Sequence, residues 1–324
     1  MSQPQELNRN FTLRTAKSSD ADEQAALLAG WNQNYVQLSA GRFTGALTES
    51  CLDGVRLFVE TTSQSLLQGG MLGDDVIAVG VPLAMTGPAV FCGAKVHRPA
   101  VFVFSGSDGF EFRSPPGLVM SGIVVPRSAV LELLSDQDRE RIASMLARAH
   151  IARVDEARVD AARHFNTAML DLLVSGRPLG PDHLGDLRIK VLSSVAELIL
   201  GGGATEPRVR RRQRWRIVAE VRRMALERDC GPMSIAEVCR AVGVSRRTLQ
   251  YCFEETLGMT PLEFLRTVRL HGARRLLRSA PSVTDAATRY GFWHLSYFSH
   301  DYRNLFGELP SQTHRRYQGH TQRV

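Results

Sequence analysis

The amino-acid sequence predicts an α+β protein in which a β-rich N-terminal domain with a helical extension precedes an all-α C-terminal domain. Three patterns predict this division. Short apolar runs with glycine-rich turns occupy residues 35–125, and a helical pattern follows over residues 127–200. The last third of the chain then repeats a set of helical segments, and an internal repeat decides the architecture of the region that carries it.

Alternation and short apolar runs predict the strands of the N-terminal domain. Residues 55–60 alternate between apolar and polar types, whereas residues 76–79 and 101–104 are continuous apolar runs. A Ser-Gly-Ser-Asp-Gly cluster follows the last run and is typical of a turn. Many short strands joined by glycine-rich turns favour a sandwich or a barrel.

An apolar stripe marks the helical extension. Leu187, Val191, Val195 and Leu198 recur at helical spacing. The stripe predicts either the seam of a homodimer or a helix face that packs on the β-rich domain, and the sequence favours neither. A homodimer is therefore one of two interpretations of this helix.

A change of composition marks the domain boundary. Residues 201–207, Gly-Gly-Gly-Ala-Thr-Glu-Pro, cannot hold a helix and predict a flexible linker. The linker separates an N-terminal domain of residues 1–200 from a C-terminal domain of residues 208–324. Six arginines follow directly, between positions 208 and 216. We expect them either to contact phosphate or to open the first helix of the C-terminal domain.

The first copy of the repeat has the signals of two helices joined by a tight turn. It begins at Ser234, where Glu237 three residues on gives a capping-box pattern. Gly243 supplies the left-handed conformation of the turn. Leu249 and Phe253, four positions apart, share the inward face of the second helix.

The second copy repeats this plan at a fixed distance. Phe298 lies 49 positions after Leu249, and Tyr302 lies 49 positions after Phe253. The turn glycine, Gly291, is 48 positions after its counterpart, so the second copy has one extra turn residue. Both copies close with Gly-x-x-Pro, and the leucine-rich segment of residues 261–278 between them predicts a helix.

The outward faces of the second helices are suited to DNA. In the first copy Arg246, Arg247, Gln250 and Tyr251 face outward. Arginine pairs with guanine edges or phosphate and glutamine pairs with adenine, and a helix-turn-helix places its second helix in the major groove. The less basic candidates in the second copy are Leu295, Ser296, Tyr297, Ser299 and His300.

A stiff connecting helix would fix the spacing of the two readers, as we call the two helix-turn-helix copies. Successive major-groove segments on one face of a duplex are about 34 Å apart. A monomeric C-terminal domain could therefore read two half-sites.

A long gapped motif lies in the second copy: Gly-Phe at 291–292, Ser-Tyr-Phe at 296–298, Tyr302, Phe-Gly at 306–307 and Pro310. With this motif, residues 215–316 resemble the DNA-binding domain of the AraC/XylS family of bacterial transcription regulators. Further runs at 31–38, 41–45, 57–60, 244–250 and 291–295 are similar to the subgroup that regulates ethanolamine-utilisation operons.

The resemblance implies a cupin-like fold and an effector-binding role for the N-terminal domain. It also implies base contacts in both readers, at Arg247, Gln250, Tyr251, Leu295, Ser296, Ser299 and His300.

The distribution of charge supports a nucleic-acid partner independently. Residues 207–324 contain 22 Arg, no Lys and 10 acidic residues, a net charge of +12. Residues 1–206 contain 18 basic and 23 acidic residues, a net charge of −5. A basic half beside a mildly acidic half indicates that one half binds a polyanion. The arginines that we expect to contact phosphate are Arg208, Arg211, Arg266 and Arg269.

Trp31, Tyr35, Arg42 and Glu60 are the candidate effector-binding residues. Aromatic residues at such spacings are more often plain core than pocket lining. Arg42 and Glu60 are charged within apolar surroundings. They could meet a zwitterionic ligand, each other or solvent.

Enzymes and metal proteins are disfavoured. The N-terminal half has four histidines but no His-x-His pair, so we expect no metal site. We find no phosphate-binding glycine loop and no nucleophile elbow, so we expect no catalytic residue and no cofactor. Five scattered cysteines, the lack of a signal-peptide core and the lack of a membrane-spanning run predict a cytoplasmic protein that associates with the nucleoid.

The sequence therefore predicts a sequence-specific DNA-binding transcription regulator, an activator, controlled by a small metabolite in the N-terminal domain. Its expected partners are duplex DNA, RNA polymerase and the effector. The alternative is a ligand-independent DNA-binding module whose N-terminal domain serves dimerisation or the binding of a protein partner.

Overall fold

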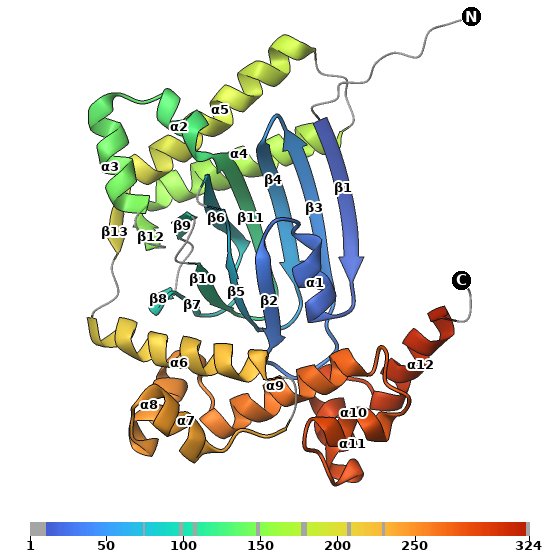
Figure 1. The fold of residues 1–324 in the computed structure, drawn as a ribbon. Helices are drawn as coiled ribbons and strands as arrows, with labels where there is room; N and C mark the ends of the chain where they lie inside the picture. The colour runs from blue at the N-terminus through green and yellow to red at the C-terminus, as the bar shows by residue number, and fades with distance from the viewer. Residues whose placement is uncertain are drawn as a thin grey trace, which may run out of the picture.

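Two antiparallel β-sheets and a C-terminal set of helices form the chain, which confirms the predicted α+β class (Figure 1). The computed structural model describes residues 11–73, 75–96, 100–105, 109–146, 150–175, 180–205, 209–228 and 231–321. Within these ranges we find no helix that is both long and apolar enough to cross a bilayer.

The larger sheet has eight strands in the order β1-β3-β4-β11-β6-β9-β12-β13. In this order they are β1 (Phe11–Ser18), β3 (Gly45–Leu52), β4 (Val55–Thr62), β11 (Leu118–Pro126), β6 (Val76–Ala84), β9 (Val101–Ser105), β12 (His150–Arg153) and β13 (Gly203–Thr205).

The smaller sheet has five strands in the order β2-β5-β10-β7-β8. They are β2 (Asn32–Gln37), β5 (Leu66–Met71), β10 (Phe110–Ser114), β7 (Ala89–Phe91) and β8 (Ala94–Val96). Apolar side chains from the facing sides of the two sheets form one core, in which Phe102 of the larger sheet meets Phe91 and Phe112 of the smaller sheet. The N-terminal region is therefore a two-sheet β-structure, as the short strands predict.

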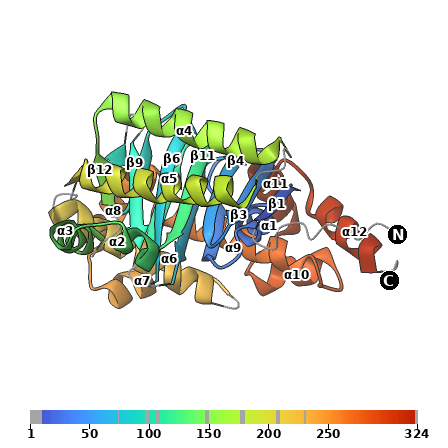
Figure 2. The same ribbon diagram turned by 90° about the horizontal axis from the view of Figure 1, so that it is seen from above.

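Helices cover the other face of the eight-stranded sheet. They are α2 (Arg127–Glu132), α3 (Asp136–Leu146), α4 (Glu156–Val174) and α5 (Pro181–Leu200), and Figure 2 shows α4 and α5 lying across the strands. The predicted apolar stripe belongs to α5: Val191, Val195 and Leu198 are buried in the core with this sheet, and Leu187 packs on Leu52. The stripe packs on the β-domain, so its interpretation as a dimer seam is wrong.

The structure departs from the sequence-based boundaries in two places. Strand β1, helix α1 (Ala21–Leu27) and strand β2 begin before residue 35, where we expected the β-rich region to start. Strand β12 lies inside the segment expected to be helical, and β13 lies inside the expected flexible linker. These short strands are stabilised by partners far away in the sequence, because β12 pairs with both β9 and β13. Local sequence patterns therefore do not predict them.

The C-terminal region consists of seven helices in the part of the chain that the structure describes. They are α6 (Val209–Glu227), α7 (Ile235–Val242), α8 (Arg246–Leu257), α9 (Pro261–Leu276), α10 (Val283–Arg289), α11 (Leu295–Phe306) and α12 (Pro310–Thr321). The predicted start and turn signals are present, since Ser234 and Glu237 form a capping box and Gly243 has φ of +68°. Gly291 has φ of +76° in the second turn. Helices α7–α8 and α10–α11 are thus the two predicted readers, joined by α9.

Candidate nucleic-acid interface and cavity

Helices α8 and α11 each bury one face and present the other. Leu249 and Phe253 of α8, and Phe298 and Tyr302 of α11, are all fully buried. The two readers have separate apolar cores, one built on the first half of α9 and the other on its second half. Figure 1 shows α8 and α11 on the side of α9 that points away from the β-sheets. The outward faces of both second helices are therefore open to a partner.

The outward face of α8 carries the four residues predicted to read bases in the first copy. Arg246 and Arg247 are exposed in the first turn of α8. The Gln250 amide donates to Glu254 Oε1 at 2.6 Å, which leaves its second N–H and its carbonyl oxygen for a base edge. Tyr251 is half-exposed, with the Arg214 guanidinium 4.4 Å from its ring centroid. This cation–π contact ties α6 to the reading helix.

The outward face of α11 is more aromatic and less charged. Leu295, Ser296 and His300 are exposed, and Ser299 is half-buried. Trp293 is 74% exposed just before the helix begins, and Tyr297 is 68% exposed. We did not single out Trp293 from the sequence; its place directly after the turn, outside the apolar periodicity, is the signal that could have found it.

The predicted phosphate-contacting arginines lie in different environments. Arg266 is exposed and pairs with Asp301 of α11. Arg269 is half-buried, with its guanidinium 4.8 Å from the Phe292 ring centroid, and burial lowers its pKa. Arg269 therefore also supports the turn of the second reader. The side chain of Arg211, in α6, is not among those described, and Arg208 lies outside the described residues.

A small cavity of about 50 Å³ lies between the two β-sheets. Its walls are mostly apolar and include six phenylalanines, and its polar lining comes from Trp31, Gln33, Tyr35, Glu60 and Gln68. Three of the four predicted effector-binding residues, Trp31, Tyr35 and Glu60, therefore line one cavity.

The fourth, Arg42, does not line this cavity. Its side chain is exposed, and its guanidinium lies 3.9 Å from Glu308 Oε2 in the C-terminal region. The backbone of the same loop contacts α11, since Gly41 N donates to Leu305 O at 3.0 Å. Arg42 thus belongs to the contact between the two regions, and the possibility that Arg42 and Glu60 pair with one another is wrong.

Glu60 is a carboxyl group buried at the cavity. Gln24 Nε2 and Tyr35 Oη each donate to Glu60 Oε1 at 3.0 Å. Burial raises the pKa of Glu60 from 4.5 to about 7, although these two hydrogen bonds oppose the shift. Burial also raises the pKa of Tyr35 well above its ordinary value, so the phenol stays protonated and keeps donating.

Comparisons with known proteins agree with the geometry of the C-terminal region. Residues 238–316 match the family model described as a helix-turn-helix domain. A probable thc operon regulatory protein of Rhodococcus erythropolis is 44% identical over 85 residues, which are 25% of this chain and 26% of the relative. The XylDLEGF operon transcriptional activator 2 of Pseudomonas putida is 36% identical over 85 residues, 25% of this chain and 54% of the relative. Residues 238–316 thus belong to a helix-turn-helix domain that is similar to those of operon regulators.

Two solved structures are also similar to this chain. The AraC-like transcriptional activator CuxR is 13% identical, with a TM-score of 0.42 over 83% of this chain and 96% of that one. A probable AraC family transcriptional regulator from Rhodopseudomonas palustris is 34% identical, with a TM-score of 0.30 over 32% of this chain and 97% of that one. The chain thus spans between a quarter and about half of the length of the two curated relatives named above.

The five-stranded sheet is a wall shared by the cavity and the helix-turn-helix domain. In β2, Gln33 and Tyr35 line the cavity. The alternate residues of β2, Asn34 and Val36, contact the helix-turn-helix domain instead. Asn34 accepts hydrogen bonds from Arg222 of α6, and Val36 packs into the core of the first reader. This division follows from the two-residue period of a strand.

Arg222 of α6 binds the outer face of this wall. Its guanidinium donates to Glu111 Oε1 of β10 at 3.0 Å and to both oxygens of Asn34, with the backbone oxygen at 3.2 Å. A Cβ at Gly69 of β5 would collide with this guanidinium, so glycine is what lets Arg222 lie flat on the sheet. Burial raises the pKa of Glu111, and Arg222 opposes that shift.

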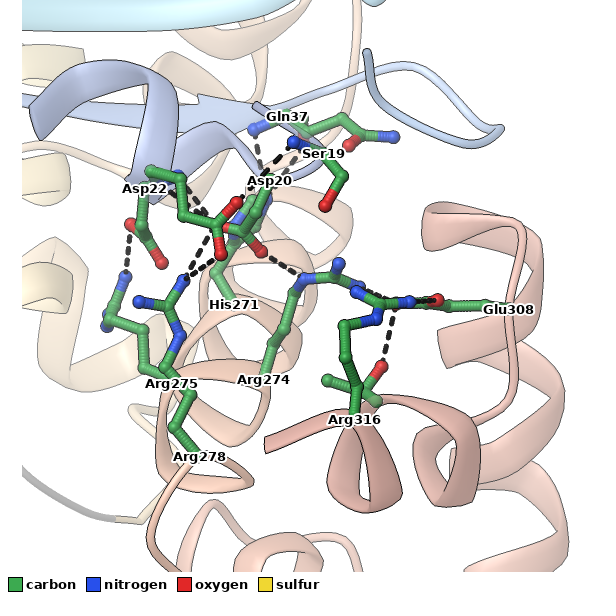
Figure 3. A network of polar contacts seen from close by, with 12 residues as sticks. Ser19, Asp20, Asp22, Gln37, His271, Arg274, Arg275, Arg278, Glu308 and Arg316 are labelled. Atoms are coloured by element: carbon green, nitrogen blue, oxygen red, sulfur yellow. Dashed lines mark hydrogen bonds and ion pairs between the residues drawn. The ribbon is translucent and has the colours of Figure 1, made fainter. Parts of the chain in front are cut away.

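A second polar network joins α9 to the N-terminal region, as Figure 3 shows. Arg274 is buried between two carboxylates: its Nε donates to Asp20, and its Nη1 lies 2.9 Å from Glu308 Oε1. Burial would raise the pKa of Asp20, but Arg274 and Arg278 outweigh it and hold that pKa below its ordinary value. Burial lowers the pKa of His271 to about 4, so its neutral ring accepts a hydrogen bond from Gln37 N at 2.9 Å.

We predict that Arg222→Met lowers the free energy of unfolding by about 3–5 kcal/mol, because it leaves the Glu111 carboxylate buried without its cation. Glu111→Gln added to Arg222→Met should recover part of this loss. Urea denaturation of the two single variants and the double variant measures the coupling. The matched control is Arg223→Met, since Arg223 is exposed on the same helix. Equal losses for the Arg222 and Arg223 variants would contradict the buried contact.

A pH-dependent effect is predicted for Glu60→Gln. In the unfolded chain Glu60 ionises near pH 4.5, and in the folded chain it ionises near pH 7. As pH rises between these values the unfolded carboxyl loses its proton first, so the wild-type chain loses stability that the variant keeps. The variant should therefore gain on the order of 2–3 kcal/mol relative to wild type between pH 5 and pH 8. Denaturation at the two pH values tests this, with Glu140→Gln at an exposed position of α3 as the control. A constant difference would show that the carboxyl is not buried.

Proposed function

We propose that this chain is a transcription regulator whose two readers bind successive major-groove segments of one operator. The observation that carries the proposal is the pair of second helices, α8 and α11, which both face away from the β-sheets on a basic domain. Helix α9 has 16 residues and is therefore about 24 Å long. We propose that this rigid connector, with one reader packed toward each of its ends, spaces the readers for half-sites one helical turn apart, about 34 Å.

The proposed contacts divide into base reading and backbone positioning. Bases are read in the major groove by the exposed faces of α8 and α11, and phosphates are bound by arginines beside them. The proposed base-reading residues are Arg246, Arg247, Gln250, Tyr251, Leu295, Ser296, Ser299 and His300. The proposed phosphate-binding residues are Arg208, Arg211, Arg266 and Arg269.

Control by a small molecule is part of the proposal. The cavity and the Arg222 contact lie on opposite faces of the same three strands, β2, β5 and β10. A ligand that shifts Gln33, Tyr35 or Gln68 therefore shifts the strands that hold α6. The proposed mechanism is a population shift with a coupling free energy of about 1–3 kcal/mol.

Several finer features belong to the same proposal. The domains are residues 1–200 and 208–324. The regulator works beside RNA polymerase in the cytoplasm and associates with the nucleoid. It is not an enzyme. Activation is supported by the name of the Pseudomonas putida relative, an operon transcriptional activator. The proposed relationship to regulators of ethanolamine-utilisation operons rests on the similarity of the sequence runs quoted above.

A ligand-independent DNA-binding module is the competing function. It would carry the same readers, but no small molecule would change its melting temperature or its affinity for DNA. The buried polar atoms of the cavity favour the ligand-controlled form.

We predict that Gln250→Ala weakens binding to the selected operator by about 1–3 kcal/mol and relaxes the choice of one base pair, because Gln can pair with adenine through two hydrogen bonds. The measurement is fluorescence polarisation with the full chain, on an operator selected from a random duplex pool and on its single-site variants, at two salt concentrations.

Gln137→Ala is the control, since Gln137 is exposed on α3 at a distance from both readers. If Gln250→Ala weakens all duplexes equally and leaves their ranking unchanged, Gln250 is not a base reader. If wild type yields no motif and only salt-sensitive binding, the sequence-specific function itself is wrong.

A further inference from the structure

The N-terminal region contacts the first reader through its five-stranded sheet. Val36 of β2 and Leu67 of β5 are buried in the apolar core of the first reader, beside apolar residues of α6. Arg113 of β10 reaches the end of α8, since a Cβ at Gly258, the C-cap of α8, would lie 3.6 Å from its guanidinium. The first reader is therefore held by the sheet as well as by α9.

The second reader is held by a different part of the N-terminal region, the segment of residues 37–42 that begins at the last residue of β2. The buried Gln37 amide donates to Leu305 O of α11 at 2.7 Å, and Gly41 N donates to the same oxygen at 3.0 Å. The Gly307 backbone, with φ of +69°, lies so close to this segment that a Cβ there would be 2.6 Å from one of its backbone nitrogens. Movement of α11 relative to β2 would therefore break these contacts.

Side chains of the N-terminal region also fix α9 between the two readers, as Figure 3 shows. Arg274 of α9 donates to Asp20, the N-cap of α1, and its Nη1 lies 2.9 Å from Glu308 Oε1 of the second reader. All three side chains are buried. Three turns of chain therefore meet at one buried charge, because Arg274 joins the N-terminal region, α9 and the second reader. Close by, Gln37 N donates to the His271 ring of α9 at 2.9 Å.

The dimensions of DNA decide how much these contacts matter. One base pair added between two half-sites moves the second half-site by about 3.4 Å and rotates it by about 35°, since a turn has 10–10.5 base pairs. An N–H···O hydrogen bond reaches only to about 3.2 Å between its heavy atoms. A shift of α11 by about one base pair would thus break the bond of Gln37 to Leu305. Readers that keep their contacts with the N-terminal region therefore fit one half-site spacing.

We propose that the N-terminal region is a template that fixes the orientation of α11 relative to α8, with Asp20 and Gln37 as positioning residues that set the half-site spacing which the regulator accepts. This inference rests on the proposed function and names residues that determine operator specificity from β2 and the N-cap of α1, not from a reading helix. Helix α9 alone defines the spacing less sharply, because helices curve along their length and the readers pack on opposite halves of this one.

The test compares the wild-type full chain with its Asp20→Asn/Gln37→Met double variant. Asparagine still caps α1, as Asp20 does, but it removes the negative charge that faces Arg274. Methionine keeps the approximate length of the Gln37 side chain but cannot donate to Leu305 O. Both changes leave the outward faces of α8 and α11 as they are.

The matched control is Asp136→Asn/Gln137→Met. It makes the same two chemical changes at neighbouring positions that are exposed on α3. We expect this control to behave as the wild type does in both measurements below.

The first measurement is fluorescence polarisation on the selected operator and on duplexes with one base pair added to or removed from its spacer. The wild type should bind the selected spacing about tenfold or more tightly than the altered spacings, because simultaneous engagement of two half-sites is lost when the geometry forbids it. The double variant should discriminate by about threefold or less. A ratio between duplexes does not depend on the fraction of folded protein, so partial unfolding of the variant cannot imitate this result.

The second measurement needs no DNA. Fluorophores attached through non-natural amino acids in place of Arg247 of α8 and Ser296 of α11, both exposed, report the distance between the two readers by energy transfer. The full chain should give one narrow distribution of distances. In the Asp20→Asn/Gln37→Met variant the distribution should broaden about twofold or more, because the second reader is no longer held against β2 and α1.

Three results would overturn the template: no spacing preference in the wild type, wild-type spacing preference in the double variant, or a distance distribution that does not broaden. An operator bound with unchanged spacing preference by the double variant leaves the regulator intact and assigns the spacing to α9. If the wild type selects no operator, the proposed function fails instead. The distance distribution then decides on the template by itself, and broadening in the double variant supports it.

Discussion

The two-residue period of strand β2 is the constraint on which the rest of the structure depends. Gln33 and Tyr35 point into the cavity, and Asn34 and Val36 point into the helix-turn-helix domain, because successive side chains of a strand leave opposite faces. A shift of β2 by one residue would exchange the two sets and place apolar Val36 at the polar end of the cavity. The cavity and the interface with α6 are therefore built from one strand and cannot vary independently.

Charge is divided between the two faces of the C-terminal domain in a way that composition does not reveal. The domain has a net charge of +12, and from the sequence we expected this positive charge to bind DNA. In the structure, Arg222, Arg274 and Arg278 pair with carboxylates of the N-terminal region. Buried pairs of this kind specify how two bodies dock more than they stabilise them, since desolvation opposes the attraction. Part of the positive charge thus holds the readers against the β-sheets, and the exposed arginines of α8 remain for a polyanion.

Local signals explain why the readers could be predicted from the sequence in detail. The capping box at Ser234, the left-handed Gly243 and the paired anchors act within one or two helical turns, and each appears in the structure as expected. The docking of the two regions depends on contacts such as Asp20 with Arg274, which are 254 positions apart and have no local signature. The position of Arg42 likewise has no local signature. Arg42 is near Trp31 in the sequence, but in the folded chain its guanidinium lies beside Glu308.

The cavity carries a cost in stability that the protein retains. Glu60, whose pKa burial raises to about 7, disfavours the folded state at neutral pH. So do the lining atoms Trp31 Nε1, Gln33 Oε1 and Gln68 Nε2, which have no hydrogen-bond partner among the described residues. An apolar residue at position 60 would avoid much of this cost, and departures from the best local packing are typical of functional sites. Of these groups, Gln33 and Gln68 belong to the five-stranded sheet, which contacts Arg222 on its other face. A ligand that satisfies these two side chains would therefore change the free energy of the same strands that hold α6. A ligand can shift an equilibrium only by its differential affinity for the two states. The destabilised cavity and the buried interface share one thin sheet, so under the proposed function a ligand bound in the cavity would change how firmly that sheet holds the readers.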